Sequence, residues 1–348
     1  MTCPSCGQPV AAEDGFCEAC GAELSPPAVS AAAPGYVPEC PVCSADPDGP
    51  PGTVSPEGYC ESCGRKVPSG RDHIELDAGL LAGVTDRGLR HQRNEDAMAL
   101  ASAQMPGGPV AVAVVCDGVS SAPRPDEASL MAARTAVRAL LASLRAGEDP
   151  AAASREAVRS ASRALADLAE PDRPEGAPSA TYVSAIVSGD AVTVCWLGDS
   201  RVYWLPSGTP DGPKARRLTS DDSVAEEMVA SGLASEADAM ASPQAHVITR
   251  WLGADLPEPR PHVERFRPPG PGVVLVCSDG LWNYRPEAAG LAELALPAAL
   301  TDPLAAAGAL VKFALDAGGT DNITVVLAPF PPARAAGPGT QSPTEENP

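Results

Sequence analysis

Two short apolar segments, far apart in the chain, each end on an Asp-Gly pair: Ala111–Gly118 (AVAVVCDG) and Gly272–Gly280 (GVVLVCSDG). Runs of this length that are rich in β-branched residues are typical of buried strands. An ionised carboxylate at the end of a buried strand costs several kcal/mol unless a cation or a set of donors meets it. We therefore predict that the two strands lie side by side and bring Asp117 and Asp279 to one site. The glycine after each Asp would let a metal ion or a phosphate approach the backbone. For either segment alone, a strand that ends in an Asp-Gly turn is the alternative.

The composition limits the classes of protein to consider. A chain of 348 residues suggests about two domains, and a hydrophobic content of 44% supports a sizeable core. The net charge of −20 argues against nucleic acid or an anionic membrane as a partner, because both require a basic surface. The chain lacks a run of 18 apolar residues and does not begin with a basic and then apolar segment. We therefore expect a soluble cytoplasmic protein with no signal peptide and no membrane span.

Eight of the eleven cysteines form four Cys-x-x-Cys pairs within the first 63 residues. Two such pairs about ten to sixteen residues apart fit one tetrahedral Cys₄ zinc site. The sequence thus predicts two successive zinc ribbons that hold two structural Zn²⁺ ions. A disulfide framework is the alternative, which the lack of an export signal disfavours. The expected ligands are Cys3, Cys6, Cys17 and Cys20 in the first ribbon and Cys40, Cys43, Cys60 and Cys63 in the second.

The acidic first 70 residues limit what the ribbons can bind. They hold two basic residues, Arg65 and Lys66, against nine acidic ones. Phosphate binding needs a basic surface, so the sequence argues against nucleic acid as the ribbons' partner. Docking of a partner protein and stabilisation of a small folded unit remain as alternatives.

Changes in composition along the chain mark the boundaries of several units. Pro and Ala fill the segment between the ribbons, and a Pro-, Ala- and Glu-bearing tail follows the last apolar run. The predicted units are a first ribbon over 1–24, a linker over 25–38, a second ribbon over 39–70, a large domain over 71–330 and a disordered tail over 331–348.

The large domain alternates apolar strands with amphipathic helices. Three helices are expected, one opened by Asp126 and Glu127 and two over 151–168 and 302–316. Scattered Pro and Gly residues predict a mobile, flap-like insertion over 211–261. Strands are expected at 79–85, 111–118, 180–187, 191–197, 201–205, 262–267, 272–280 and 323–327.

Five acids of this domain fall at strand edges or turns: Asp96, Asp117, Asp199, Asp279 and Asp321. No cluster of His or Cys accompanies them, and all-oxygen ligation suits Mg²⁺ or Mn²⁺. Two such ions a few ångströms apart, bridged by one Asp, can lower the pKa of a shared water and hold a phosphoryl oxygen. The pattern therefore predicts metal-assisted hydrolysis of phosphoesters.

From about residue 76 to 329 the chain resembles the PP2C-type (PPM) metal-dependent protein Ser/Thr phosphatases of bacteria. Each short motif is common alone, but six follow one another in the family's order. They are Asp86-Arg87-Gly88 running to Asn94-Glu95-Asp96, Val115-Cys116-Asp117-Gly118, Gly198-Asp199-Ser200-Arg201, Leu218-Thr219-Ser220-Asp221-Asp222-Ser223, Cys277-Ser278-Asp279-Gly280-Leu281 and Gly319-Thr320-Asp321-Asn322-Ile323-Thr324.

The resemblance implies an α+β fold, a four-layer α-β-β-α sandwich, with two Mn²⁺ or Mg²⁺ ions at one end of the two sheets. Asp117 would bridge both ions, Asp279 and Asp321 would complete the first site, and Asp96 and the Gly118 carbonyl would serve the second.

Further roles follow from the same resemblance. Asp199 and Asp279 would hold the third ion of bacterial members. Water activated by the ions would attack phosphorus in line, without a phosphoenzyme, so Cys116, Cys195 and Cys277 would be packing residues. The substrate would be a phosphorylated protein, a Ser/Thr kinase or its target.

Several positions depart from the family pattern, and one of them concerns the substrate phosphate. Where the family has an Arg that contacts the substrate phosphate, this chain has His91, with Arg90 beside it. Either side chain could take that role, so both join Asp117 and Asp279 as candidate catalytic residues. The departure keeps a second hypothesis open, a pseudophosphatase or phosphoprotein-binding module that docks partners through its zinc ribbons.

Overall fold

The computed structural model describes residues 58–332 except 170–175, 210 and 257, together with 7–10, 19, 27–32, 36, 38–40, 43 and 53–55. The cysteines expected to form the first ribbon and the tail after residue 332 lie outside the described residues.

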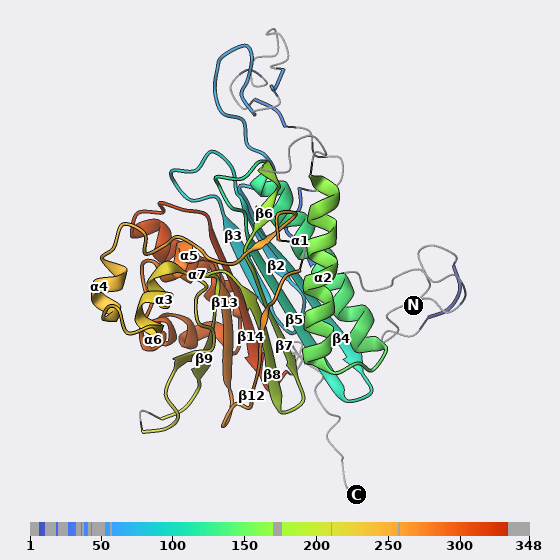
Figure 1. Cartoon of the computed structure of the whole chain (residues 1–348). Coiled ribbons are helices and arrows are strands. Elements are labelled where there is room, and N and C mark those ends of the chain that lie inside the picture. The colour runs from blue at the N-terminus through green and yellow to red at the C-terminus, as the bar shows by residue number, and fades with distance from the viewer. Residues whose placement is uncertain are drawn as a thin grey trace, which may run out of the picture.

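Two antiparallel six-stranded sheets stack face to face, with helices on both outer faces (Figure 1). In the described chain the strands of the first sheet run in the order β1-β4-β5-β7-β8-β12, and those of the second in the order β10-β9-β13-β14-β3-β2. Helices α1 and α2 pack on the first sheet, and α6 and α7 pack on the second. The predicted α-β-β-α sandwich is confirmed.

The described elements have the following bounds. The first sheet contains β1 (Ala28–Val29), β4 (Asp96–Met105), β5 (Gly108–Asp117), β7 (Tyr182–Ser188), β8 (Ala191–Leu197) and β12 (His262–Phe266). The second contains β2 (His73–Asp77), β3 (Ala82–Asp86), β9 (Arg201–Pro206), β10 (Arg216–Arg217), β13 (Gly272–Cys277) and β14 (Ile323–Phe330). A separate pair is β6 (Ser179–Ala180) with β11 (Leu252–Gly253). The helices are α1 (Pro125–Arg145), α2 (Pro150–Leu168), α3 (Val224–Ala230), α4 (Glu236–Met240), α5 (Asp279–Trp282), α6 (Ala288–Ala299) and α7 (Pro303–Asp316).

Strand β5 shows why the central strands are apolar at every position. Its residues 110, 112, 114 and 116 pack towards α1 and α2, whereas residues 111, 113 and 115 pack between the two sheets. Because side chains of a strand alternate between its faces, a strand covered on both faces has no polar side. The β5 and β13 segments were predicted to be buried strands for this reason, and both are.

The predicted arrangement of those two strands is wrong in one respect. They do not lie side by side, because β5 belongs to the first sheet and β13 to the second. The strands instead lie in facing sheets, and their Asp-bearing ends are at the same end of the sandwich, where Asp117 and Asp279 line one pocket. The sequence could not distinguish a neighbour within a sheet from one across the core.

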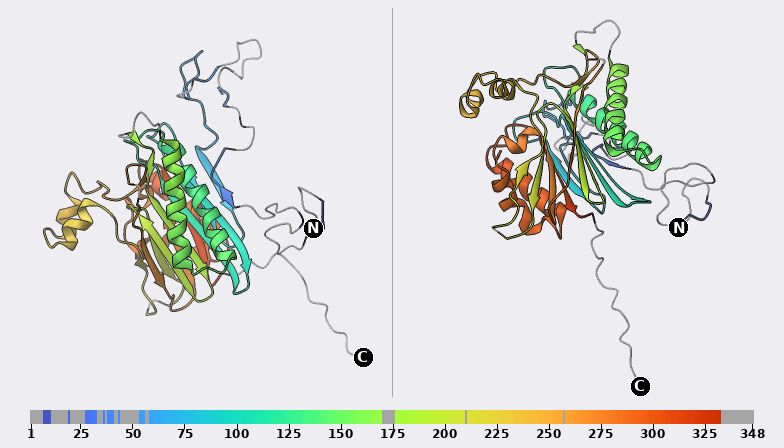
Figure 2. Two further views of the ribbon diagram at one scale, coloured as in Figure 1. Left: turned by 45° about the vertical axis from the view of Figure 1, so that its right-hand side comes forward. Right: turned by 60° about the horizontal axis from the view of Figure 1, so that its bottom comes forward.

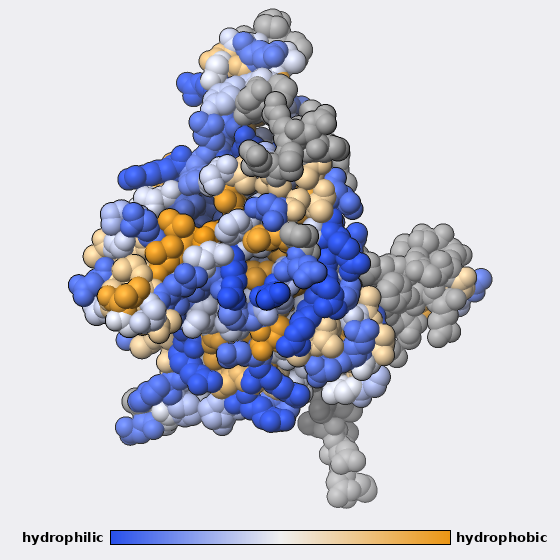
Figure 3. Space-filling view, in the orientation of Figure 1, coloured by the Kyte–Doolittle hydropathy of each residue, from blue (hydrophilic) through white to orange (hydrophobic). Residues whose placement is uncertain are grey.

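Helices α3 and α4 project away from the sandwich, whereas β1, from the N-terminal region, joins its first sheet. Helices α3 and α4 project from the body in each view (yellow, Figures 1 and 2). Leu233, between the two helices, and Met240, at the end of α4, are exposed. Apolar surface is visible at the left of the molecule in Figure 3. At the other side, β1 comes from the expected linker over 25–38 and pairs with β4, with Val29 opposite Ala99.

No helix of the described chain has the length and apolar character needed to cross a membrane.

Candidate metal centre

Two of the predicted ligands face each other across one pair of strands. Asp96 begins β4 and Asp117 ends β5, and the register pairs these two residues directly. Like charges at directly opposite positions destabilise a sheet. The backbone therefore holds two carboxylates together at a place where only a cation or protonation relieves their repulsion.

The other predicted acids reach the same end of the sandwich from loops. Asp279 follows β13, Asp321 precedes β14, and Asp199 lies between β8 and β9. A pocket of about 470 Å³ is lined by Asp117, Gly118, Asp199, Asp279 and Asp321. Asp96 is 0% exposed and lies beneath these residues, opposite Asp117. The structure thus brings all six predicted positions to one end of the two sheets.

Only one of the two carboxylate oxygens of Asp96 accepts hydrogen bonds from the described residues. Its Oδ2 accepts hydrogen bonds from Ser278 Oγ at 2.6 Å and from Thr324 Oγ1 at 2.7 Å. Its Oδ1, and likewise Oδ1 of Asp279, is buried without a hydrogen-bond partner in the described part of the chain. A buried acceptor without a partner costs about 1–3 kcal/mol. Two such carboxylate oxygens at one site fit the ligand set of a hard cation.

Four acids of the site, Asp96, Asp117, Asp199 and Asp279, keep their protons to a higher pH than ordinary carboxyl groups do. Burial, opposed by the hydrogen bonds of Ser278 and Thr324, raises the pKa of Asp96 to about 6. Burial and then the charge of Asp221 raise the pKa of Asp199 to about 7. Burial and the charges of neighbouring acids raise the pKa values of Asp117 and Asp279 well above the usual range. Bound divalent cations would remove this opposition to ionisation.

The glycine after each Asp has a role that the sequence did not show. A Cβ at Gly118 would lie 2.3 Å from the carbonyl oxygen of Pro125, and a Cβ at Gly280 would lie 1.9 Å from that of Asn322. Either contact is far too short, so both positions require glycine for close approach of the chain to itself.

The two candidates for the phosphate contact differ in position. His91 is partly buried, and its Nε2 lies 3.2 Å from Oδ1 of Asp321 in the pocket wall. Arg90 is exposed. The Arg87 guanidinium donates to the carbonyl of His91 and therefore holds this loop. His91 is the candidate next to the predicted ligands.

Several residues at the site carry no signal in the sequence patterns considered above. His246 and Trp251, from the segment after α4, line the pocket of the acids. His246 also lines a second pocket of about 700 Å³, together with Trp282 and Arg201. Ser278 and Thr324 stand inside the motifs that supplied Asp279 and Asp321, but only the structure shows that they bind Asp96. The three cysteines expected to be packing residues, Cys116, Cys195 and Cys277, are 0% exposed.

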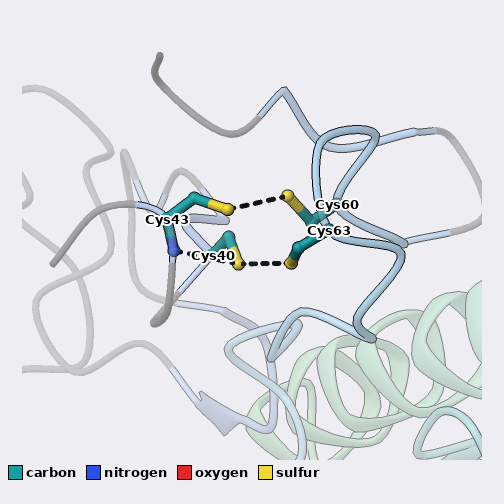
Figure 4. A group of neighbouring side chains, drawn as sticks. All are labelled: Cys40, Cys43, Cys60 and Cys63. Carbon is teal, nitrogen blue, oxygen red and sulfur yellow. Dashed lines mark hydrogen bonds between the residues drawn. The ribbon is translucent and has the colours of Figure 1, made fainter. Parts of the chain in front are cut away.

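The second set of predicted zinc ligands forms a compact cluster. The two Cys-x-x-Cys pairs face each other, with Sγ–Sγ distances of 3.5 Å for Cys40–Cys63 and 3.7 Å for Cys43–Cys60 (Figure 4). A disulfide needs about 2.05 Å, whereas thiolates about 2.3 Å from a tetrahedral zinc are separated by about 3.8 Å. Among the described residues, this is the one group of three or more potential ligands whose donor atoms all lie within 4.8 Å of one another. The four thiols therefore fit Zn²⁺, and the disulfide alternative is wrong for this set.

The chain is similar to known proteins over most of its length. Residues 88–306 match the family described as Protein phosphatase 2C, and residues 2–24 match a zinc-ribbon domain. The serine/threonine phosphatase stp of Listeria welshimeri is 30% identical over 247 residues, which cover 70% of this chain and 92% of that protein. The solved structure of the PPM Ser-Thr phosphatase MsPP from Mycobacterium smegmatis in complex with cacodylate is 30% identical with a TM-score of 0.53, and the match covers 73% of this chain and 99% of MsPP. The solved catalytic domain of the serine threonine protein phosphatase PstP in complex with 2 manganese ions is 25% identical with a TM-score of 0.54, over 71% of this chain and 96% of that one.

Proposed function

Because the chain belongs to the protein phosphatase 2C family and is a protein serine/threonine phosphatase, we propose that it hydrolyses phosphoserine and phosphothreonine at a dinuclear centre. The observation that carries this proposal is the pair of buried carboxylate oxygens without partners, on Asp96 and Asp279, at the end of the sandwich where the other acids gather. When bound, two Mn²⁺ or Mg²⁺ ions would supply the activated water and the positive charge that a phosphoryl group requires.

Each acid has a proposed part in holding the ions. Asp117 would bridge the two, Asp279 and Asp321 would complete one site, and Asp96 with the Gly118 carbonyl would complete the other. Asp199 would share a third ion with Asp279. The solved PstP domain in complex with two manganese ions supports the two-ion part of this proposal. The position of Asp117, Gly118, Asp199, Asp279 and Asp321 around one pocket supports the choice of ligands.

The test of the function is release of phosphate from a phosphothreonine peptide by the full chain. Hydrolysis is expected in Mn²⁺ or Mg²⁺ and is expected to stop in EDTA, because the acids alone cannot neutralise a phosphoryl group. p-Nitrophenyl phosphate serves as a substrate that needs no peptide contacts. A folded protein that binds Mn²⁺ with no turnover of either substrate would contradict the proposal and favour a phosphoprotein-binding module.

We also propose His91, in preference to Arg90, as the phosphate contact. Replacing His91 by Ala is expected to raise the KM for p-nitrophenyl phosphate about tenfold, because a hydrogen bond to a charged group contributes about 1.5 kcal/mol. The effect on kcat should be smaller, since the predicted metal ligands are unchanged. Arg90→Ala is the matched comparison and should leave KM within about twofold. The opposite pattern would assign the phosphate contact to Arg90.

The proposed substrate follows from the family membership, whereas the proposed zinc sites rest on the cysteines of the first 63 residues. The substrate is a phosphorylated protein, and a Ser/Thr kinase or a kinase target is the proposed partner. Two structural Zn²⁺ ions are proposed, one for each ribbon. The second is supported by the geometry of its four thiols and the first by the zinc-ribbon match over residues 2–24. Docking of a partner protein is a proposed role for the ribbons.

A further inference from the structure

A four-residue turn, Ser69 to Asp72, joins the second cysteine cluster to the first strand of the large domain. Ser69 Oγ donates to Asp72 Oδ1 at 2.7 Å, and the amide of Arg71 donates to Ser69 Oγ at 3.2 Å. Gly70 has a φ of 75°, and a Cβ there would lie 2.8 Å from the ring of Tyr36. The Tyr36 hydroxyl donates to the Pro68 carbonyl at 2.9 Å. Local hydrogen bonds and the packed ring therefore hold the turn in one conformation.

The guanidinium of Arg71 joins three separate parts of the fold. It donates to the carbonyl oxygens of Ser30 at 3.2 Å, Asp126 at 2.9 Å and Asp96 at 3.0 Å. These carbonyls belong to the residue after β1, the first turn of α1 and the first residue of β4. A guanidinium carries five N–H donors in a rigid planar fork, so one side chain can fix three backbone positions at once. Burial lowers the pKa of Arg71, although nearby Asp126 opposes this effect.

The same turn holds the loop that leads into the metal centre. Asn94 Nδ2 donates to the carbonyl of Arg71 at 3.2 Å, and the amide of Arg87 donates to the carbonyl of Asp72 at 2.7 Å. Arg87 in turn holds the carbonyl of His91. The turn therefore contacts both ends of the loop between β3 and β4, which carries the proposed phosphate contact and ends at Asp96.

The segment before the second cysteine cluster attaches to β4 as well. The amide of Ser30 donates to the Met98 carbonyl at 3.0 Å, and the Met98 amide donates to Ser30 Oγ at 2.8 Å. Because Arg71 also donates to the Ser30 carbonyl, residues 30 and 71 are tied to each other and to the start of β4. Cys40, Cys43, Cys60 and Cys63 lie in the sequence between these two fixed residues.

We propose that Arg71 is a positioning residue that couples the second cysteine cluster to the metal centre by fixing the backbone of Asp96. This inference rests on the proposed function, since it gives Asp96 the role of a ligand. An intact cluster joins the cysteines that follow Ser30 in the chain to those that precede Arg71, and Arg71 transmits that constraint to β4. Loss of the cluster then weakens binding of the catalytic ions without any change in their ligands.

The test measures Mn²⁺ affinity by titration calorimetry on the full chain, beside activity at saturating Mn²⁺. Arg71→Met removes the three hydrogen bonds but keeps most of the apolar stem, and is expected to weaken Mn²⁺ binding about tenfold or more, as substitutions behind a metal ligand do. Its kcat at saturating Mn²⁺ should change by less than about threefold. Arg71→Lys keeps the charge and should give an intermediate affinity. Arg138→Met, an exposed Arg on α1, is the matched control and should bind Mn²⁺ as the original chain does.

The coupling to the cysteine cluster is tested by a double-mutant cycle. Cys60→Ser is expected to weaken Mn²⁺ binding in the same direction, and the double variant should bind no more weakly than Arg71→Met alone, because both changes act through one connection. Independent, multiplying effects would overturn the coupling. Unchanged Mn²⁺ affinity in folded Arg71→Met, or in Arg71→Lys if the Met variant does not fold, would overturn the positioning role. Because affinity is measured without turnover, failure of this proposal is distinguishable from failure of the proposed function.

Discussion

Replacing Asp279 by Asn is expected to lower kcat for metal-dependent hydrolysis of p-nitrophenyl phosphate by roughly three orders of magnitude. Asn has nearly the same shape and can still accept the hydrogen bond that Asn283 Nδ2 donates at 3.1 Å. It cannot supply the negative charge proposed to hold two of the ions. Loss of several kcal/mol of transition-state stabilisation corresponds to this reduction, since about 1.4 kcal/mol is a factor of ten. Steady-state kinetics in saturating Mn²⁺ measure it.

The matched control is Asp190→Asn. Asp190 is an exposed acid between β7 and β8, at the opposite end of β8 from Asp199, and it pairs with Arg267 at 3.1 Å. This variant should keep full activity. If Asp279→Asn also kept activity within about tenfold of the original chain, the assignment of Asp279 to the metal centre would be wrong.

The thermal stability of the metal-free protein gives a second, independent test of Asp279→Asn. The pKa values of Asp96 and Asp199 are raised to about 6 and about 7, from an ordinary value of 3.8, and that of Asp279 is raised well above it. Between about pH 4 and 7 the folded state therefore binds more protons than the unfolded state, so stability should fall as the pH rises. Asp279→Asn removes one of these charges. Its metal-free form should melt at a higher temperature than the original chain at pH 8, and this difference should shrink towards pH 4.

The sequence predicted best those elements whose local pattern and tertiary position agree. Strands β5, β8 and β13 are rich in β-branched residues and are buried on both faces, so composition alone indicates them. Strand β4 was missed. Its sequence DAMALASAQM has no β-branched residue, and it is a strand because β1 and β5 pair with its two edges. Helix α6 was missed as well, since Pro297 stands inside it.

For the candidate site too, the sequence identified only the residues that have a local pattern. The acids were found because all of them fall at strand edges or turns and most stand beside Gly, Asn or Ser, a pattern visible within a few residues. Arg71 was not found, because its three acceptors at positions 30, 96 and 126 are brought together only by the fold. His246 was missed for the same reason, since the segment after α4 reaches the pocket only in three dimensions. Local patterns therefore identify candidate ligands, whereas the groups that would position those ligands require the structure.

Replacing Arg201 by Met is expected to destabilise the fold by about 3–5 kcal/mol. Arg201 and Asp221 form a buried pair: their side chains are each 6% exposed, and the guanidinium binds both carboxylate oxygens at 2.6 to 3.2 Å. The guanidinium also lies 3.5 Å from the centre of the Trp282 ring. Removing one partner leaves the other charge buried without its closest counter-charge. Urea unfolding of the metal-free protein measures the loss.

A double-mutant cycle separates the charge pair from mere packing. Asp221→Asn alone should cost a similar amount, whereas the double variant Arg201→Met/Asp221→Asn should cost much less than the sum, because no unpaired charge remains. Additive losses would mean that the pair contributes little.

Loss of Arg201 should also affect the metal centre, because Arg201 contacts the Trp282 indole, which donates to the Asp199 carbonyl at 2.9 Å. Arg201→Met is therefore expected to weaken Mn²⁺ binding at the site proposed for Asp199 more than at the two sites proposed to involve Asp117.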